Sequence, residues 1–226
     1  MTRITRRDVS VLRDLALSHV LSRDQLMQLG YFGSITRANT RTRELVRLGF
    51  ARRLESPFFS QSLFMVTKQA SDVVGERISG LIENRAASPR FVQHAMSVTN
   101  VRIALSSKSN GTWRFEQQLW RTLKGSTRIE VRPDGLYQAS QPIFIEVDMG
   151  HASATRFKEK LTAYEALARS GQCQALYGFN QFRVLTVTTG SLRSRHLVRL
   201  QPPNAGFEFL VRTFEEVGAT PISPWS

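Results

Sequence analysis

The stretch "RPDGLYQASQPIFIEVDMGHASATRFKEKLTAYEAL", residues 132–167, decides how the second half of the chain folds. Two apolar runs, 135–137 and 142–147, have the length and composition of strands and are separated by a short polar turn. The segment that follows them has the composition and length of a helix. Three acids flank the two runs: Asp134, Glu146 and Asp148. The stretch therefore predicts two adjacent strands and a helix, with several carboxylates close together in a strongly basic protein.

Outward from this stretch, the pattern predicts an α/β fold in which a mixed sheet is flanked by helices. The expected elements are a helix in "FVQHAMSVTNVRIALSS", strands in "TWRFEQQLW", "RIEVRPDGLYQ", "PIFIEVD" and "FRVLTVTT", and helices in "SATRFKEKLTAYEALARSG" and "SLRSRHLVRL". We assign residues 91–215 to this domain and residues 216–226 to a flexible tail.

The N-terminal part reads as three helices. Residues 6–18 carry apolar side chains on one helical face. Ser22, followed by Gln25 three residues later, fits a capping box that opens a short second helix. A third helix begins at the candidate cap Ser34 and runs to about Leu48. A helix, a short helix and a longer basic helix are the order of a helix-turn-helix.

A predicted hairpin follows, and it indicates which kind of helix-turn-helix this is. Two strand-like runs, around 50–54 and 62–66, are separated by a turn, and Thr67 is placed to cap a fourth helix. This order is typical of a winged helix. We expect a winged-helix DNA-binding domain over residues 1–80, joined by a linker at 81–90.

Charge indicates the class of partner. The chain has 31 Lys and Arg against 18 Asp and Glu, a net charge of +13, and most of the basic residues are arginine. Because the arginine fork matches phosphates and guanine edges, double-stranded DNA is the expected partner. No segment has the apolar length of a membrane span, so we expect a cytoplasmic protein without membrane contact. The single cysteine, Cys173, excludes an internal disulfide.

The third helix is the expected reader of DNA, because the early residues of a second helix-turn-helix helix enter the major groove. The wing would lie near the phosphate backbone. The candidate DNA-binding residues are Arg37, Asn39, Thr40, Arg41 and Arg43 on the helix, and Arg52 and Arg53 on the wing. Two other interpretations stay open: a solvated helix face, or a winged helix that contacts proteins.

The acids resemble a known nuclease motif. Pro133-Asp134 stands as the PD, and Glu146-Val147-Asp148 stands as the (D/E)xK, of the PD-(D/E)xK nuclease superfamily. The resemblance implies a site in which Asp134 and Glu146 hold Mg²⁺ or Mn²⁺, with Asp148 as a further ligand and Glu116 as an additional acid. Asp148, however, occupies the place of the superfamily's lysine.

That departure leaves two outcomes. Lysine migration of the kind known in the superfamily would let Lys160, or its neighbour Lys158, reach back from the following helix and act in catalysis. Alternatively, the domain is a degenerate nuclease that only binds DNA and needs no cofactor. Tyr164, on the same helix face as Lys160, is either a core residue or a nucleophile for covalent chemistry.

The order of motifs along the whole chain, from "RELVRLGF" through "HAMSVTNVRIAL" to "FIEVDMGHASATRFKEKLTAYEAL", resembles the replication-relaxation family, which includes MobC-type plasmid mobilisation proteins. The resemblance implies a mobile-element protein that nicks DNA with Mg²⁺ or organises it for a partner enzyme of the relaxosome. The alternative is a non-catalytic accessory or regulatory DNA-binding protein. In a third interpretation the second domain is a dimerisation platform and the protein a homodimer.

Overall fold

The computed structural model describes residues 3–74, 88–125, 127–203 and 205–223. The chain divides into two compact units. The first comprises Met1–Asn100 together with Ile222–Ser226, and the second comprises Val101–Pro221. The boundary falls inside helix α6 (Pro89–Lys108). Most of the expected linker at 81–90 lies outside the described residues.

The first unit opens with three helices, each begun by a hydroxyl cap: α1 (Arg6–Ser18), α2 (Arg23–Gln28) and α3 (Ile35–Arg47). The capping box predicted at Ser22 is present, since Ser22 and Gln25 exchange side-chain and backbone hydrogen bonds. Gly49, directly after the end of α3, has a φ of 80°, which glycine adopts without strain. The helices therefore begin and end where local sequence signals place them.

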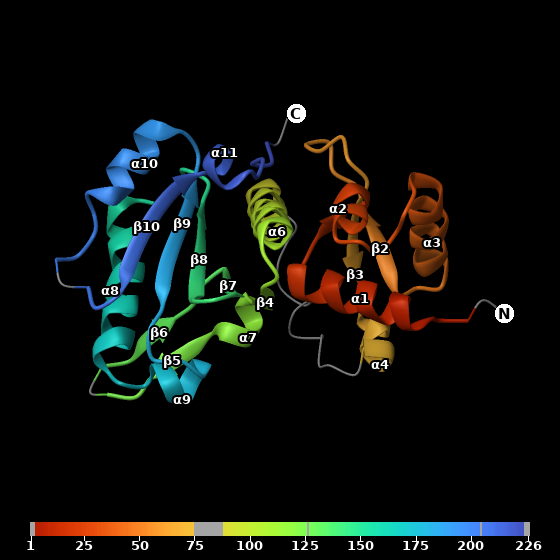
Figure 1. Ribbon diagram of the computed structural model, residues 1–226. Helices are drawn as coiled ribbons and strands as arrows, with labels where there is room; N and C mark the ends of the chain where they lie inside the picture. Colours follow the sequence, from red (N-terminus) through yellow and green to blue (C-terminus); the bar gives the residue numbers. More distant parts are fainter. Residues whose placement is uncertain (1–2, 75–87, 126, 204, 224–226) are drawn as a thin grey trace. The chain divides into compact units, whose positions relative to one another are not determined.

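A small antiparallel sheet completes this unit (Figure 1). Strands β2 (Ala51–Leu54) and β3 (Leu63–Val66) form the expected hairpin, and β1 (Leu21–Ser22) pairs with β3 on its other side. A short 3-10 helix η1 (Lys68–Ala70) and α4 (Ser71–Val74) follow. The rest of the expected fourth helix lies outside the described residues.

Thr67 corrects one expectation. It makes no capping hydrogen bond, and its hydroxyl instead donates to the carbonyl of Gly49 at 2.5 Å. Thr67 thus ties the exit of β3 to the end of α3. The core beneath is built from leucines of all three helices, among them Leu12, Leu26 and Leu45, each at most 1% exposed.

The second unit is built on a five-stranded mixed sheet in the order β10-β9-β8-β7-β4. Its strands are β4 (Thr112–Phe115), β7 (Gly135–Gln138), β8 (Pro142–Asp148), β9 (Arg183–Thr188) and β10 (Glu208–Thr213). Strands β8, β9 and β10 are parallel, whereas β7 and β4 are antiparallel to their neighbours. The predicted α/β fold with a mixed, helix-flanked sheet is confirmed.

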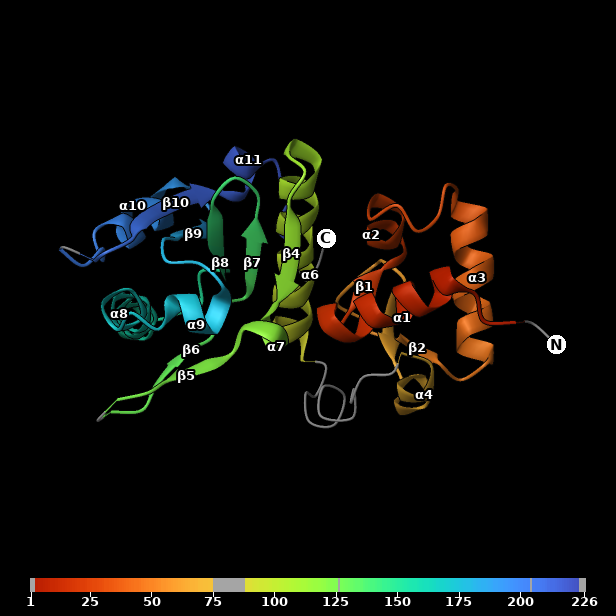
Figure 2. The ribbon, with the colours of Figure 1, turned by 60° about the horizontal axis from the view of Figure 1, so that its bottom comes forward.

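Helices cover both faces of this sheet (Figures 1 and 2). The elements outside it are α7 (Glu116–Leu119), the hairpin β5 (Arg121–Leu123) and β6 (Ile129–Val131), α8 (Ala154–Arg169), α9 (Cys173–Tyr177), α10 (Ser191–Val198) and α11 (Phe214–Val217). Phe144 on β8 packs in one aromatic core with side chains of α8, α9 and α10. Tyr137 on β7 points to the opposite face, where its hydroxyl donates to the carbonyl of Leu105 in α6.

The second unit differs from expectation in several places. The single strand expected in "RIEVRPDGLYQ" is two strands, β6 and β7, which belong to different sheets, and neither β5 nor α9 was expected. The predicted strand 112–120 ends at Phe115, because Glu116 begins α7. Strand β10 follows α10, and its short apolar pattern did not lead us to predict a strand. Helix α11 spans the boundary set at residue 215 between the predicted domain and the predicted tail.

Candidate functional site

Backbone pairing places Asp134 beside Glu146. The Asp134 N–H donates to the carbonyl of Ile145 at 3.0 Å, and the Val147 N–H donates to Asp134 Oδ2 at 2.7 Å. These two bonds fall on β8 on either side of Glu146. Gly135, the next residue, leaves room for the ring of Trp113 on β4, because a Cβ at that position would lie 2.1 Å from Trp113 Cζ2. The first two predicted acids are therefore neighbours at the start of β7 and the end of β8.

Helix α8 supplies two partners to Glu146. The carboxylate is only 3% exposed. Lys160 Nζ forms an ion pair with Oε2, and the hydroxyl of Tyr164 donates to Oε1 at 2.6 Å. The two helical residues are four positions apart and so lie on one face, one turn from each other. Lys158, the other lysine candidate, is exposed.

The buried setting changes the acid–base properties of this group. Burial raises the pKa of Glu146 to about 7, since the positive charge of Lys160 only partly offsets the lost hydration and the neighbouring charge of Asp134 adds to the rise. Burial disfavours the charged form of Lys160, but the charges of Asp134 and Glu146 outweigh it and raise the lysine pKa. The Lys160 side chain remains 41% exposed. The lysine is therefore a cation that solvent can reach, paired with Glu146 and attracted by the charge of Asp134.

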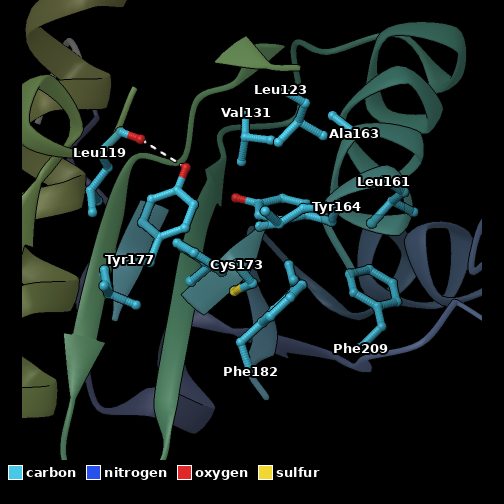
Figure 3. Close-up of a cluster of buried hydrophobic side chains, with 14 of the residues drawn as sticks. Leu119, Leu123, Val131, Leu161, Ala163, Tyr164, Cys173, Tyr177, Phe182 and Phe209 are labelled. Atoms are coloured by element: carbon cyan, nitrogen blue, oxygen red, sulfur yellow. Dashed lines mark hydrogen bonds between the residues drawn. The ribbon is translucent and has the colours of Figure 1, made fainter. Parts of the chain in front are cut away.

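Tyr164 has a structural position. It is 2% exposed, lies among the core side chains of α8 (Figure 3), and burial raises its pKa well above the usual value. A buried phenol that donates its proton to Glu146 is poorly placed to attack a phosphodiester. The geometry makes Tyr164 a positioning residue for Glu146, a role that sequence reasoning missed although the four-residue spacing from Lys160 indicated a shared face.

Glu116 borders the group. It begins α7, and its Oε1 accepts from Arg132 Nε at 2.5 Å. Its charge also contributes to the raised pKa of Lys160. Glu116 is thus part of the same electrostatic environment, although its direct partner is an arginine.

Asp148 is separated from the other acids by its own ion pair. Arg193 of α10 donates to both carboxylate oxygens, at 2.7 and 3.0 Å, and the hydroxyl of Thr188 donates to Oδ2 at 2.8 Å. These bonds join β8, β9 and α10, so the Asp148 carboxylate has partners of its own, apart from Lys160 and Tyr164. No local sequence signal identified Arg193, because its contact with Asp148 spans 45 residues.

The oxygens of Asp134 and Glu146 are ligands of the kind that Mg²⁺ prefers, so the donor chemistry fits a hard cation. Thr186, paired in register with Glu146 on β9, has a buried hydroxyl without a hydrogen-bond partner in the described part of the protein. Among the described residues, no group of three or more His, Cys, Asp or Glu side chains is placed to hold a metal ion. Asp134 and Glu146 form a pair of carboxylates, and the carboxylate of Glu146 is already bound by Lys160.

Most of the predicted DNA-binding residues are exposed in the structure, whereas Arg41 is paired with a buried acid. Arg37, Thr40 and Arg43 of α3 are exposed at i, i+3 and i+6, so they share one face of the helix. Asn39 is half-buried beside this face, and its carbonyl accepts from Arg43 Nε. Arg52 and Arg53 on β2, the residues predicted for the wing, are both exposed.

Arg41 is placed differently. Its guanidinium donates to Asp8 at 2.7 and 2.5 Å, and the Asp8 side chain is fully buried. Burial works against the charge of Asp8, but hydrogen bonds from Arg41 and Thr5 lower its pKa overall. Arg41 therefore joins α3 to α1, and its guanidinium is turned away from the exposed face of α3.

Comparison with known proteins identifies one family. The replication-relaxation family model matches residues 12–182, which is more than half of the chain and includes Asp134, Glu146 and Lys160. No curated protein and no solved structure was found to match. None of the described helices is long and apolar enough to cross a membrane. The chain thus belongs to the replication-relaxation family, as its motifs predicted, and this membership points to a role in plasmid replication or mobilisation.

Proposed function

We propose that the protein binds double-stranded DNA of a mobile element and nicks it in a metal-dependent reaction during plasmid mobilisation. The first unit would read DNA through the exposed face of α3 and the arginines of β2, in the manner of a winged helix. The second unit would cleave one phosphodiester bond at the group formed by Asp134, Glu146 and Lys160.

One observation carries the catalytic part of the proposal. A solvent-accessible lysine on α8 is bonded to the buried Glu146, directly beside Asp134, in a protein whose net charge attracts phosphates. In this proposal Lys160 takes the part of the lysine that is missing at position 148. Perturbed pKa values in such a cluster are typical of functional sites.

The residues have distinct roles in this proposal. Asp134 and Glu146 would hold Mg²⁺ or Mn²⁺, which when bound would supply positive charge to the scissile phosphate. Lys160 would orient the attacking water or stabilise the charge that develops on the phosphate oxygens. Tyr164 fixes the rotamer of Glu146 through its hydrogen bond, and Glu116 adds negative charge near the lysine.

Nicking of supercoiled plasmid with Mg²⁺ or Mn²⁺ tests this function. Wild type is expected to convert plasmid to the open circle, and Asp134→Ala and Glu146→Ala are expected to lose this activity. Asp148→Asn serves as a matched control, because it alters an acid on the same strand whose partner is Arg193. Equal nicking by wild type and both alanine variants would disprove the proposal.

A specific observation supports a second candidate, a non-catalytic DNA-binding accessory protein. Both oxygens of Glu146 are engaged by the protein itself, by Lys160 and by Tyr164, so this carboxylate has its partners without a metal ion. This candidate predicts DNA binding that weakens steeply with salt, with no metal uptake and no cleavage. Calorimetric titration with Mn²⁺ separates the two, because only the first candidate requires heat of binding that is lost in Asp134→Ala.

A further inference from the structure

The β5–β6 hairpin has two different faces. The strands pair antiparallel, with Leu123 opposite Ile129 and Arg121 opposite Val131. Leu123 and Val131 are at most 6% exposed and point toward Ala163 of α8 (Figure 3). Because side chains alternate along a strand, the residues between them face the other way.

The outward face is basic and carries a tryptophan. By this alternation it bears Trp120, Lys124, Arg128, Glu130 and Arg132, all of them exposed. Lys124, Arg128 and Arg132 outnumber the single acid, whose carboxylate accepts from Arg128 at 2.6 Å and from the indole N–H at 3.2 Å. The hairpin extends beyond the five-stranded sheet (Figure 2), so this face has no covering element among the described residues.

Trp120 is held in one orientation despite its exposure. The guanidinium of Arg132 lies 4.6 Å from the centroid of its ring, and the indole N–H is bonded to Glu130. The residue nevertheless remains 46% exposed, although tryptophan side chains are highly buried on average. Glu130 holds the edge of the indole and Arg132 covers one side of it. The ring therefore presents a preformed flat surface to a ligand.

One contact and one charge effect connect this surface to the candidate site. Arg132, which lies over Trp120, also donates to Glu116, and the charge of Glu116 acts on Lys160. The outward face of the hairpin and the carboxylate group are therefore joined through α7. A nucleic acid strand bound on this face would lie against Arg132, the residue that holds Glu116 of α7.

We infer that Trp120, with Lys124, Arg128 and Arg132, is a stacking platform for an unpaired base of single-stranded DNA. Aromatic side chains beside cations bind single strands in this way, because every base offers a flat face to the ring and the cations hold the phosphates. Paired bases inside a duplex do not present that face. Resting on the proposed nicking function, this makes the substrate of the second unit a strand that has left the duplex.

Anisotropy of a labelled 15-nucleotide oligo-dT and of a matched hairpin duplex tests the platform. Trp120→Ala is expected to weaken binding of oligo-dT about tenfold, with duplex binding changed less than twofold, and Trp120→Phe is expected to restore most of the loss. Leu192→Ala is the matched control, because Leu192 is an apolar residue that is 76% exposed on α10. Oligo-dT should also quench tryptophan fluorescence in wild type and not in Trp120→Phe.

Unchanged affinity of Trp120→Ala for oligo-dT, or an equal loss for duplex and single strand, would overturn the inference. The proposed nicking function fails separately. If Asp134→Ala nicks plasmid like wild type while Trp120→Ala loses the single strand, the platform stands and the nuclease does not. If Asp134→Ala is inactive and Trp120→Ala binds normally, only the platform is rejected.

Discussion

Lys160 of α8 is the ion-pair partner of Glu146 on β8, fourteen residues earlier in the chain. The pair is asymmetric, because the glutamate is buried while the lysine is partly open to solvent. Charge from Asp134 and Glu116 acts on the same lysine. This arrangement determines which substitutions should affect activity and which should affect only stability.

Lys160→Ala is expected to reduce plasmid nicking about 100-fold, because the cation that faces the phosphate is lost. Lys158→Ala is the matched control, since Lys158 is exposed on the same helix two residues away. Its initial nicking rate should equal that of wild type. A loss of the same size in both variants would assign the effect to general DNA attraction and not to the site.

Tyr164→Phe removes the hydroxyl that donates to Glu146 Oε1. Because that bond lowers the pKa of Glu146, its loss should move the rise of nicking rate with pH to a value above 7 while the maximal rate persists. A pH–rate profile of both proteins measures the shift. Complete inactivity at every pH, together with a covalent DNA adduct in wild type, would instead make Tyr164 the nucleophile.

Glu146→Gln should change how stability depends on pH. The glutamate has a pKa of about 7 in the folded protein against 4.5 as the ordinary value, so between these pH values the folded state binds more protons than the unfolded chain. The free energy of unfolding of wild type should therefore fall by roughly 3 kcal/mol from pH 4.5 to 7, and the glutamine variant should lack this fall.

Urea denaturation at several pH values gives the slopes. Glu159→Gln, an exposed change on the same helix, should leave the slope of wild type unaltered. Parallel slopes for wild type and Glu146→Gln would show that the buried carboxylate does not titrate in this range.

Arg41→Ala and Arg37→Ala should have opposite consequences. The first leaves the buried Asp8 without its cation and is expected to lower the free energy of unfolding by about 3 kcal/mol. The second removes an exposed charge, so stability should stay constant while duplex affinity falls and its salt dependence weakens by about one unit of slope. Thermal melts and salt-dependent binding isotherms distinguish the two effects. A stable Arg41→Ala variant that binds DNA poorly would instead make Arg41 a DNA-binding residue.

Local signals in the sequence were sufficient for most elements. The caps at Ser22 and Ser34, the apolar run 142–147 and the hairpin before Thr67 each depend on residues a few positions apart, so short windows of sequence contain the physics that forms them. Strand β10 escaped prediction because it is stabilised by pairing with β9, a contact that no short window contains.

The sequence by itself determined that a strongly basic member of the replication-relaxation family carries a pair of carboxylates on adjacent strands, followed by a helix with lysines. Only the tertiary structure decided which lysine and which acids meet. The rotation of α8 places Lys160 on Glu146 and Lys158 in solvent, and packing of α10 gives Asp148 to Arg193. A buried charge without a partner is costly because it has lost its hydration. Which residue becomes its partner depends on the packing of elements that are distant in the sequence.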